Sequence, residues 1–254
     1  MNHKITKIYK KIYKFYLLIN VYNEGKRLHR LLSTIPLNRN YGVMVCDSPS
    51  TDGSTKLNIL KKFNVDIILK MNERSDHSKT LLESLIVIKK IIGRGGGIII
   101  VDGNGKDELS YVKYFISKIK DGYDYIQGSR FLKKGMEINT PFLRKFLIKF
   151  VHAPLTSLAC RKYYTDSTNG FRAISKNFLD KNIKLMKRQN LIYYEIYFYI
   201  CFLASRKKYK VCEIPVVRKY LKSKVTTKIL TLNQYWQMLK PPLLQVLNIK
   251  YKLN

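Results

Sequence analysis

Short apolar runs alternate with amphipathic segments over the first hundred or so residues of the chain. Four runs predict strands, at 15–22, 41–46, 65–69 and 97–103. Three segments between them have helical spacing of their apolar positions, at 24–35, 53–63 and 78–92. Short strands that are apolar throughout are buried on both faces, and strands separated by helices pair in parallel. The pattern therefore predicts an α/β fold with a Rossmann-like, doubly wound and mostly parallel sheet flanked by helices.

Beyond residue 120 the alternation is less regular. The segment DYIQGSRF (124–131) predicts a strand and a turn, and a helical region interrupted by proline follows to about residue 160. The polar, glycine-containing segment 163–175 is typical of a loop positioned over a site. A buried helix at 190–204 and a strand at 210–217 come next.

Both ends of the chain carry basic segments. The leader, residues 1–14, repeats lysine and isoleucine at helical spacing, which predicts either a short interfacial helix or a solvated leader. An apolar stripe near the other end predicts a helix that Pro241 and Pro242 stop, and it consists of Ile229, Leu232, Trp236 and Leu239. We expect one catalytic domain over 1–217, with 218–254 as a C-terminal helical appendage.

Polar and acidic residues follow three of the predicted strands at the point where each strand ends. They are Asn23 and Glu24 after the first strand, Asp47 after the second, and Asp102, Gly103 and Asn104 after the fourth. Ligands of doubly wound sheets bind beyond the carboxyl ends of the strands. The chain has 17 acidic residues against 48 basic ones, so acids at these ends indicate a binding site.

The formal charge of +31 indicates either that the protein binds anionic partners or that its lysine content does not reflect function. Nucleic acid, an anionic membrane surface and phosphorylated substrates are the candidate partners, and a coding bias toward Lys, Ile, Asn and Tyr is the alternative. The lysines are dispersed and no helix-turn-helix, RNP or zinc pattern is present, which disfavours specific nucleic-acid binding. A basic nucleic-acid-binding module remains the alternative from another functional class.

The sequence also bears on location. No apolar run reaches the roughly 20 residues of a membrane-spanning helix, and the longest, 191–204, contains Glu195. The four cysteines have no C-x-x-C spacing, so neither a zinc knuckle nor a disulfide framework is indicated. We expect a cytoplasmic protein that associates peripherally with the inner face of the cell membrane, through its basic surface, the aromatic 190–204 helix and the Trp236 helix.

Five ordered motifs resemble those of family 2 glycosyltransferases, most of all the dolichol-phosphate-mannose synthase branch and related bacterial enzymes. They are VYNEGKRL (21–28), VCDSPSTDGS (45–54), IIIVDGNGKD (98–107), QGSRF (127–131) and DSTNGFRA (166–173). The resemblance implies a GT-A fold and an inverting transfer of a sugar from a nucleoside diphosphate sugar. It implies a polyprenyl phosphate or a surface glycan as acceptor. A catalytically degenerate GT-A domain is the alternative within the family.

The resemblance also assigns the donor side of the site. It implies that Asn23, Glu24, Asp47, Asp102, Gly103 and Asn104 bind the donor. Asp102 and Asn104 occupy the D-x-D positions that bind Mg²⁺ or Mn²⁺ in the family. The sequence departs from the family at Ser48 and Asn104, where acids are usual, and at Lys106, where a Gln is usual. We hypothesise that Lys106 pairs with the donor diphosphate and lowers the metal requirement. The alternative is that Lys106 points to solvent. In that case Asp107 caps the next helix or completes the metal site.

The phosphate and acceptor side follows from the later motifs. The resemblance assigns Ser129, Arg130, Arg144, Asn169 and Arg172 to phosphate or acceptor binding, and guanidinium groups can grip phosphate oxygens bidentately. Arg144 on a solvated surface is the alternative for that residue. An anionic lipid phosphate needs no general base, whereas a sugar hydroxyl does, and Asp166 is then the candidate base. Asp102, Asp166 and Arg172 are the predicted catalytic residues.

Overall fold

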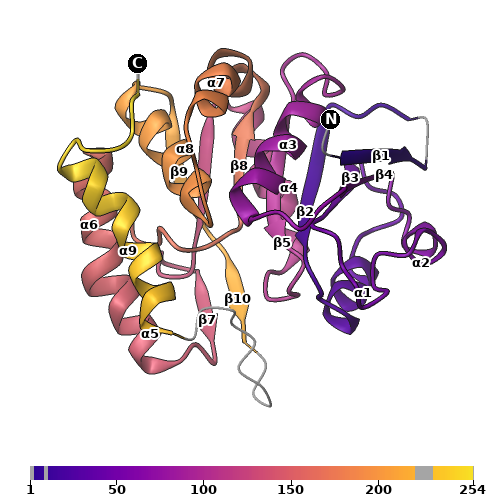
Figure 1. Ribbon diagram of the computed structural model, residues 1–254, viewed down its shortest axis with the longest axis horizontal. Coiled ribbons are helices and arrows are strands. Elements are labelled where there is room, and N and C mark those ends of the chain that lie inside the picture. Colours follow the sequence, from indigo (N-terminus) through magenta and orange to yellow (C-terminus); the bar gives the residue numbers. More distant parts are fainter. Residues whose placement is uncertain (1–2, 9–10, 221–230, 254) are drawn as a thin grey trace.

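The computed structural model describes residues 3–8, 11–220 and 231–253. Within these residues a central sheet has the strand order β1-β4-β3-β2-β5-β8-β6-β9, and a small sheet pairs β10 with β7 (Figure 1). The strands are β1 (His3–Lys7), β2 (Phe15–Val21), β3 (Gly42–Asp47), β4 (Ile67–Met71), β5 (Gly97–Asp102), β6 (Tyr125–Ser129), β7 (Met136–Ile138), β8 (Arg172–Ser175), β9 (Val211–Pro215) and β10 (Val217–Lys219).

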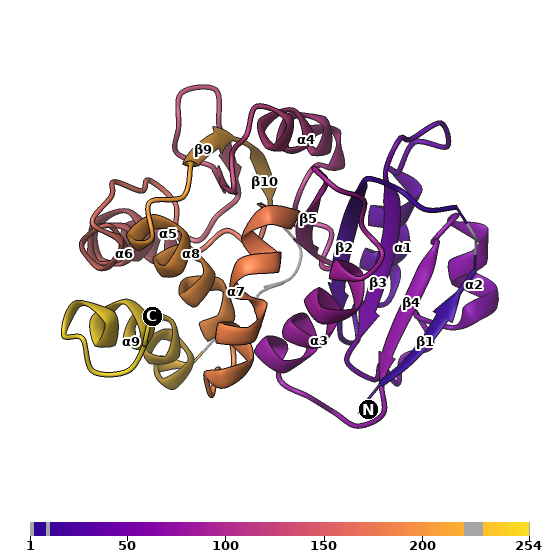
Figure 2. The same ribbon diagram turned by 90° about the horizontal axis from the view of Figure 1, so that it is seen from above.

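Helices cover both faces of the central sheet. They are α1 (Lys26–Ser33), α2 (Leu57–Lys62), α3 (His77–Lys89), the 3₁₀ turn η1 (Leu109–Tyr111), α4 (Val112–Lys120), α5 (Phe142–Leu147), the π-helical turn η2 (Ile148–His152), α6 (Ala153–Cys160), α7 (Lys176–Arg188), α8 (Glu195–Arg206) and α9 (Leu232–Val246). Figure 2 shows α3, α7 and α8 on one side of the strands and α4 on the other. The predicted α/β fold with a doubly wound, mostly parallel sheet is confirmed.

The core is divided into two clusters by the sheet. Along β2 every residue is buried, and successive side chains point to opposite faces. Leu18 belongs to the cluster under α3, α7 and α8, whereas Leu17 and Ile19 belong to the cluster under α1, α2 and α4. The wholly apolar strands of the sequence are thus explained by burial on both faces, and the four predicted strands and three predicted helices all form.

The prediction that 163–175 is entirely a loop is wrong at its end. Residues 172–175 form β8, which pairs antiparallel with both β5 and β6. Its burial pattern is uniform, because the strand lies in the middle of the sheet with helices over both faces. This insertion fixes Arg172 beside the end of β5, where Asp102 is located.

Residues 3–7 of the N-terminal leader form a strand, so the predicted interfacial helix is wrong there, and their side chains are exposed or partly exposed. The strand is β1, which pairs antiparallel with β4 from His3 opposite Met71 to Lys7 opposite Ile67. Without this strand, β4 would be an open edge with unpaired backbone groups, and edge pairing satisfies them.

The C-terminal helix does not stop at its prolines. Helix α9 begins with a capping box at Thr231 and continues through Pro241 and Pro242. Pro242 has no N–H for the carbonyl of Met238 four residues earlier, and Nε2 of His152 donates to that carbonyl at 2.9 Å instead. Trp236 is half exposed, and Ile229 lies outside the described residues.

The aromatic helix predicted at 190–204 forms as α8 and is buried, from Glu195 through Ala204. The Glu195 carboxylate accepts hydrogen bonds from Lys250 Nζ at 2.7 and 2.8 Å, which compensates its burial. Helix α8 is therefore a core element and presents no membrane-binding face. Among the described residues, no helix combines the length and apolar character required to span a bilayer.

Candidate active site

A cleft of 490 Å³ opens at the carboxyl ends of the central strands. Its walls include Asn20 to Tyr22 at the end of β2, Ser48 after β3 and Asp102 at the end of β5. Helix α3 and the loop before α8 supply the facing wall with His77 and Tyr194. The cleft therefore lies where the sequence predicted it, at the ends of the parallel strands.

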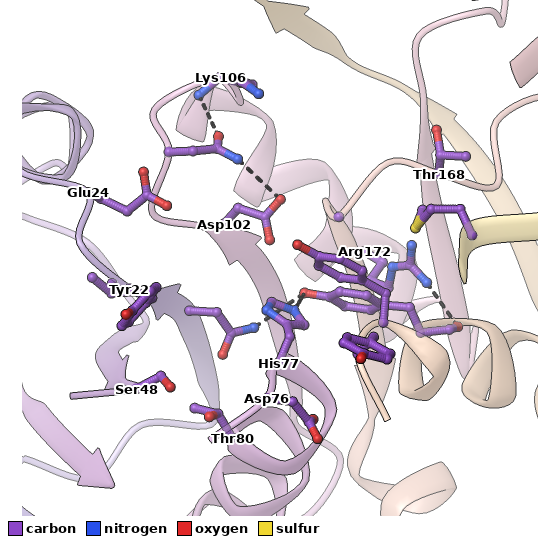
Figure 3. Close-up of a pocket in the computed structure, with 18 of the residues that line it drawn as sticks. Tyr22, Glu24, Ser48, Asp76, His77, Thr80, Asp102, Lys106, Thr168 and Arg172 are labelled. Carbon is purple, nitrogen blue, oxygen red and sulfur yellow. Dashed lines mark hydrogen bonds between the residues drawn. The ribbon is translucent and has the colours of Figure 1, made fainter. Parts of the chain in front are cut away.

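Asp102 is at the centre of this cleft (Figure 3). Its side chain is 25% exposed, and its Oδ2 lies 3.4 Å from the Arg218 guanidinium. Burial alone would raise the pKa of Asp102, but the charges of Arg218, His77 and Lys106 outweigh it and lower the pKa. Asp102 is therefore a carboxylate that faces the cleft at neutral pH.

Asn104 and Lys106 follow Asp102 on a tight turn. The backbone N–H of Lys106 donates to Asn104 Oδ1 at 3.1 Å, so the amino group of Asn104 faces Asp102 Oδ2 at 3.3 Å. Asn104 therefore presents a donor, and not an oxygen, toward Asp102. No group of three or more His, Cys, Asp or Glu residues is placed to hold a metal ion among the residues described. The predicted ligand pair Asp102 and Asn104 is adjacent, but its chemistry fits Mg²⁺ or Mn²⁺ poorly.

Lys106 does not point to solvent, so that alternative is wrong. The residue is 5% exposed, lines the cleft, and places Nζ over the Tyr220 ring at 4.4 Å from its centroid. Burial, followed by the charges of Arg218 and Arg144, lowers the pKa of Lys106 to about 7. The surroundings of Lys106 thus disfavour a further cation and favour an anion.

Asp107 neither caps a helix nor stands free to complete a metal site. Arg218 NH1 donates to both Asp107 oxygens, at 2.7 and 2.5 Å, and to Asn169 Oδ1 at 2.9 Å. Although burial opposes its charge, the carboxylates of Asp107 and Asp102 raise the pKa of Arg218. Arg218 therefore connects β10, the loop after β5 and the loop before β8.

A second group of side chains continues the cleft toward α8. The hydroxyl of Tyr197 accepts a hydrogen bond from Asn20 Nδ2 at 3.3 Å and lies 2.9 Å from His77 Nε2. The Arg172 guanidinium is centred 4.2 Å from the Tyr197 ring. Its NH2 donates to the Asn169 carbonyl at 2.6 Å and its NH1 to the Tyr197 carbonyl at 3.0 Å. Arg172 is 2% exposed and lines the cleft, as a positively charged group held by carbonyls.

The predicted donor residues separate into two groups. Glu24 lines the cleft near Asp102 and forms an ion pair with Arg27 at 2.9 Å. Asp47 is fully buried and accepts hydrogen bonds from Ser50 Oγ at 2.6 Å and Thr55 Oγ1 at 2.7 Å. Neither Asp47 nor Asn23 is among the residues that line the cleft.

The loop that holds these residues contains a left-handed turn. Asn23 has φ +50° and accepts from the backbone N–H of Thr51 at 2.8 Å, which joins the loops after β2 and β3. Asp47 and Asn23 thus shape the loops beside the cleft, and Glu24 and Ser48 line it. Gly103 continues the turn after Asp102, and a Cβ there would come within 3.0 Å of Val21 Cγ2.

The structure contradicts Asp166 as a general base. Arg130 Nε donates to Asp166 Oδ2 at 2.6 Å and Arg130 NH2 to Oδ1 at 2.8 Å, with both side chains buried. The Arg130 interactions hold the pKa of Asp166 below its ordinary value although burial raises it. Ser129 is likewise buried, against Thr165 Oγ1 at 2.6 Å. None of Ser129, Arg130 and Asp166 lines the cleft, because they hold β6 to the loop before β8.

The residues predicted to bind phosphate or acceptor line the cleft only in part. Arg144 and Arg172 line the cleft as predicted, and Asn169 lies behind it with its amide oxygen on Arg218. Sequence reasoning missed Arg218, His77, Tyr194 and Tyr197. Arg218 was detectable as another arginine in a lysine-rich chain, in VVRKY (216–220). The aromatic residues carried no such signal, since their 190s helix reads equally well as core.

The boundary predicted at residue 217 stays a prediction, but it does not separate the cleft from the C-terminal segment. Arg218 and Met238 both line the cleft. His152 connects the two parts: its Nε2 donates to the Met238 carbonyl and its Nδ1 accepts from Ser167 Oγ at 2.7 Å. Residues on both sides of 217 therefore form one site.

The sequence of the chain is similar to that of a known mannosyltransferase. A dolichol-phosphate mannosyltransferase from Pyrococcus furiosus is 27% identical over 173 residues, which cover 66% of this chain and 47% of the relative. The chain thus matches about half the length of that relative. No protein-family model matches the chain.

Solved structures share the fold at low sequence identity. Glucosyl-3-phosphoglycerate synthase from Mycobacterium tuberculosis, solved with Mn²⁺, UDP and glucosyl-3-phosphoglycerate, has a TM-score of 0.66 at 12% identity, covering 94% of this chain and 80% of its own. A mannosyltransferase from Pyrobaculum calidifontis, solved with GDP-Man and Mn²⁺, has a TM-score of 0.52 at 13% identity, covering 85% and 59%. These structures show that the chain has the GT-A fold, and its likeness to the mannosyltransferase, together with the ordered motifs, supports a relationship to family 2 glycosyltransferases.

Proposed function

We propose that the chain transfers a sugar, with inversion, from a nucleoside diphosphate sugar to a phosphate-bearing acceptor. The observation that carries the proposal is the position of Asp102, a cleft-facing carboxylate at the end of β5 that lies between Glu24 and Arg172 in Figure 3, in a cleft that Arg144 also lines. This arrangement suits a donor whose sugar and ribose hydroxyls meet acids and whose phosphates meet guanidinium groups.

The chemistry is a direct displacement at the anomeric carbon. The acceptor oxygen forms a new bond to this carbon from the face opposite the leaving group, and the bond to the diphosphate oxygen breaks. The nucleoside diphosphate departs with the electron pair. Positioning of the two reactants and neutralisation of the leaving diphosphate supply most of the acceleration in such a site.

The pairing of Asp166 with Arg130 supports an anionic acceptor. A sugar hydroxyl must lose a proton to a base, and the predicted base is tied to Arg130 away from the cleft. A phosphate oxygen already carries its negative charge near neutral pH and needs no base. Arg144 and Arg172 line the cleft and give such a phosphate cationic partners. We therefore favour a polyprenyl phosphate over a glycan hydroxyl.

A lipid acceptor requires access to a membrane, and the α5–η2–α6 region offers a suitable surface. Large apolar side chains are exposed there, namely Phe142, Leu143, Phe146, Phe150, Leu158 and Tyr163. Lys149 and Arg161 lie among them and line a pocket beside α6. An exposed apolar face bordered by cations fits an anionic lipid surface. We propose peripheral association with the inner face of the cell membrane through this surface.

The donor is tested by thermal stability in the presence of ligands. A ligand that binds the folded state alone stabilises it by about 2.7 kcal/mol at one hundred times its Kd. We expect one nucleoside diphosphate sugar of a UDP and GDP panel to raise the melting temperature selectively. Equal, negligible shifts for every nucleotide sugar, together with salt-sensitive binding to duplex DNA, would instead favour the nucleic-acid-binding alternative.

A further inference from the structure

Cationic side chains outnumber acids in the cleft around Asp102. Among the described residues that line it, five are Lys or Arg and three are Asp or Glu. Lys106 is one of these cations, and its side chain is enclosed between the loop after β5 and Tyr220. Three of the five cations, Lys106, Arg172 and Arg218, are buried, and buried charges of one sign disfavour one another unless an anion is near. The cleft is thus suited to a multiply charged anion before any metal ion is considered.

Hydrogen-bond donors occupy the place beside Asp102 where a divalent cation would bind. Asp102 Oδ2 faces both Asn104 Nδ2 at 3.3 Å and Arg218 NH2 at 3.4 Å. The nearby Asp107 carboxylate is held on both oxygens by Arg218. A metal ion at Asp102 would have one carboxylate as ligand and a guanidinium beside it, and both features weaken its binding.

Lys106 is fixed by its backbone on two sides. Its N–H donates to Asn104 Oδ1 at 3.1 Å, and its carbonyl accepts from the backbone N–H of Lys219 at 2.8 Å. No carboxylate forms an ion pair with Lys106 within the part of the chain that the structure describes. The ammonium instead lies over the Tyr220 ring, at the edge of the cleft. Its position is set by the fold, and Asp102 and Asp107 act on its charge without a direct ion pair.

We infer that the ammonium of Lys106, and not a divalent cation, neutralises the donor diphosphate, while Arg218 holds Asp102 and Asp107 in place. The inference rests on the proposed function, because it concerns the donor of that reaction. The ammonium supplies one positive charge at the diphosphate as the bond to the anomeric carbon breaks and the electron pair moves to the leaving oxygen. The remaining negative charge meets the guanidinium groups that line the same cleft.

Equilibrium binding of UDP and GDP tests this inference without reliance on turnover. Titration calorimetry is carried out in EDTA and in Mn²⁺ with wild type, Lys106→Gln and Asn104→Asp/Lys106→Gln. Lys113→Gln is the matched control, since Lys113 is an exposed lysine on α4 outside the cleft. Circular dichroism and melting temperature confirm that each variant is folded. Free Mn²⁺, followed by its paramagnetic resonance signal, reports metal binding directly.

We expect wild type to bind one of the two nucleotides with a Kd that changes by less than about threefold between EDTA and Mn²⁺. Lys106→Gln should weaken binding in EDTA by about tenfold or more, in line with loss of a charge-assisted contact, and Lys113→Gln should not. The double variant should bind Mn²⁺ and regain at least about a tenfold metal dependence.

Two results would overturn the inference alone, and a third would overturn the proposed function. Nucleotide binding by wild type in Mn²⁺ and not in EDTA would remove the ammonium account and leave the proposed glycosyl transfer standing. Equal binding by Lys106→Gln and Lys113→Gln in EDTA would have the same meaning. Failure of every nucleotide to bind, with or without Mn²⁺, would overturn the proposed function itself.

Discussion

The guanidinium of Arg130 grips the carboxylate of Asp166 through two hydrogen bonds of 2.6 and 2.8 Å, with both side chains withdrawn from solvent. Both residues belong to motifs that the sequence assigned to catalysis or phosphate binding. Their pairing instead joins β6 to the loop that leads into β8. That loop carries Thr168 and Gly170 to the wall of the cleft, so the pair positions the site without entering it.

Asp166→Asn should destabilise the protein and leave the chemistry intact. Removal of one member of a buried ion pair leaves the other charge uncompensated and costs about 3 to 5 kcal/mol. Urea unfolding measures this loss, and transfer assayed well below the melting temperature should stay within about threefold of wild type. Unchanged stability with transfer abolished would restore Asp166 as the base.

The sequence predicted the elements that depend on neighbouring residues, and it missed those that depend on residues far away along the chain. Strands such as β2 and β5 were recognisable because an unbroken apolar run reports burial on both faces directly. β1 was not, because its pairing with β4 depends on residues at least sixty positions away. The continuation of α9 through Pro242 depends on a hydrogen bond from His152, which no local pattern contains.

The same distinction between local and distant interactions applies to the residues of the candidate site. Asp102 was identified by its place at a strand end, and Arg144 and Arg172 by motif. The reassignment of Asp166 and the recruitment of Arg218 both arise from ion pairs between segments distant in sequence. Residue type and motif indicated the candidate charged groups. The fold determined which of them line the cleft and which are paired with other side chains.

Gly170→Ala should impair the site at Asp102 while the fold is kept. A Cβ at position 170 would lie 2.8 Å from Asp102 Oδ2 and 3.1 Å from its Cγ, so the carboxylate must move. A shift of this size at a binding group costs about tenfold in nucleotide affinity or more. Gly93→Ala is the control, since its Cβ would meet its nearest neighbour at 3.9 Å. If both variants bind nucleotide like wild type in calorimetry, the carboxylate is not part of the donor site.

His152 should make stability depend on pH. Burial lowers the pKa of His152 to about 4, so the folded protein keeps the ring neutral while an unfolded histidine takes up a proton near pH 6.5. The free energy of unfolding should therefore fall as the pH decreases from about 6.5 to about 4, by up to about 3 kcal/mol. Below that range the contribution is fully lost.

The measurement compares wild type with His152→Gln, by chemical denaturation at pH 7, 5.5 and 4.5. We expect the variant to be less stable at pH 7, because it loses the bonds to Met238 and Ser167, and to have a flatter profile. Parallel profiles for the two proteins would mean that His152 titrates normally and that the link between α9 and Ser167 is weaker than described.

The exposed apolar side chains of α5 and η2 should bind anionic vesicles. Phe142→Ser/Phe146→Ser/Phe150→Ser should lower co-sedimentation with anionic vesicles at least about tenfold, because each buried aromatic ring contributes on the order of 2 kcal/mol. The control replaces three other exposed apolar residues, Leu37, Leu57 and Tyr114. Wild type should bind neutral vesicles weakly and leave anionic ones as salt increases. Equal loss in both triple variants would remove this surface as the membrane contact.

The most direct test of the central claim is sugar transfer by Asp102→Asn. The variant keeps the size of the side chain and removes the charge that faces the cleft. Wild type, supplied with the nucleoside diphosphate sugar that stabilises it most and with a polyprenyl phosphate, should form a glycosylated lipid and release the nucleoside diphosphate in equal amounts. Asp102→Asn should melt within a few degrees of wild type and transfer at least about a hundredfold more slowly. Transfer at a near-normal rate by the folded variant would contradict an active site centred on Asp102.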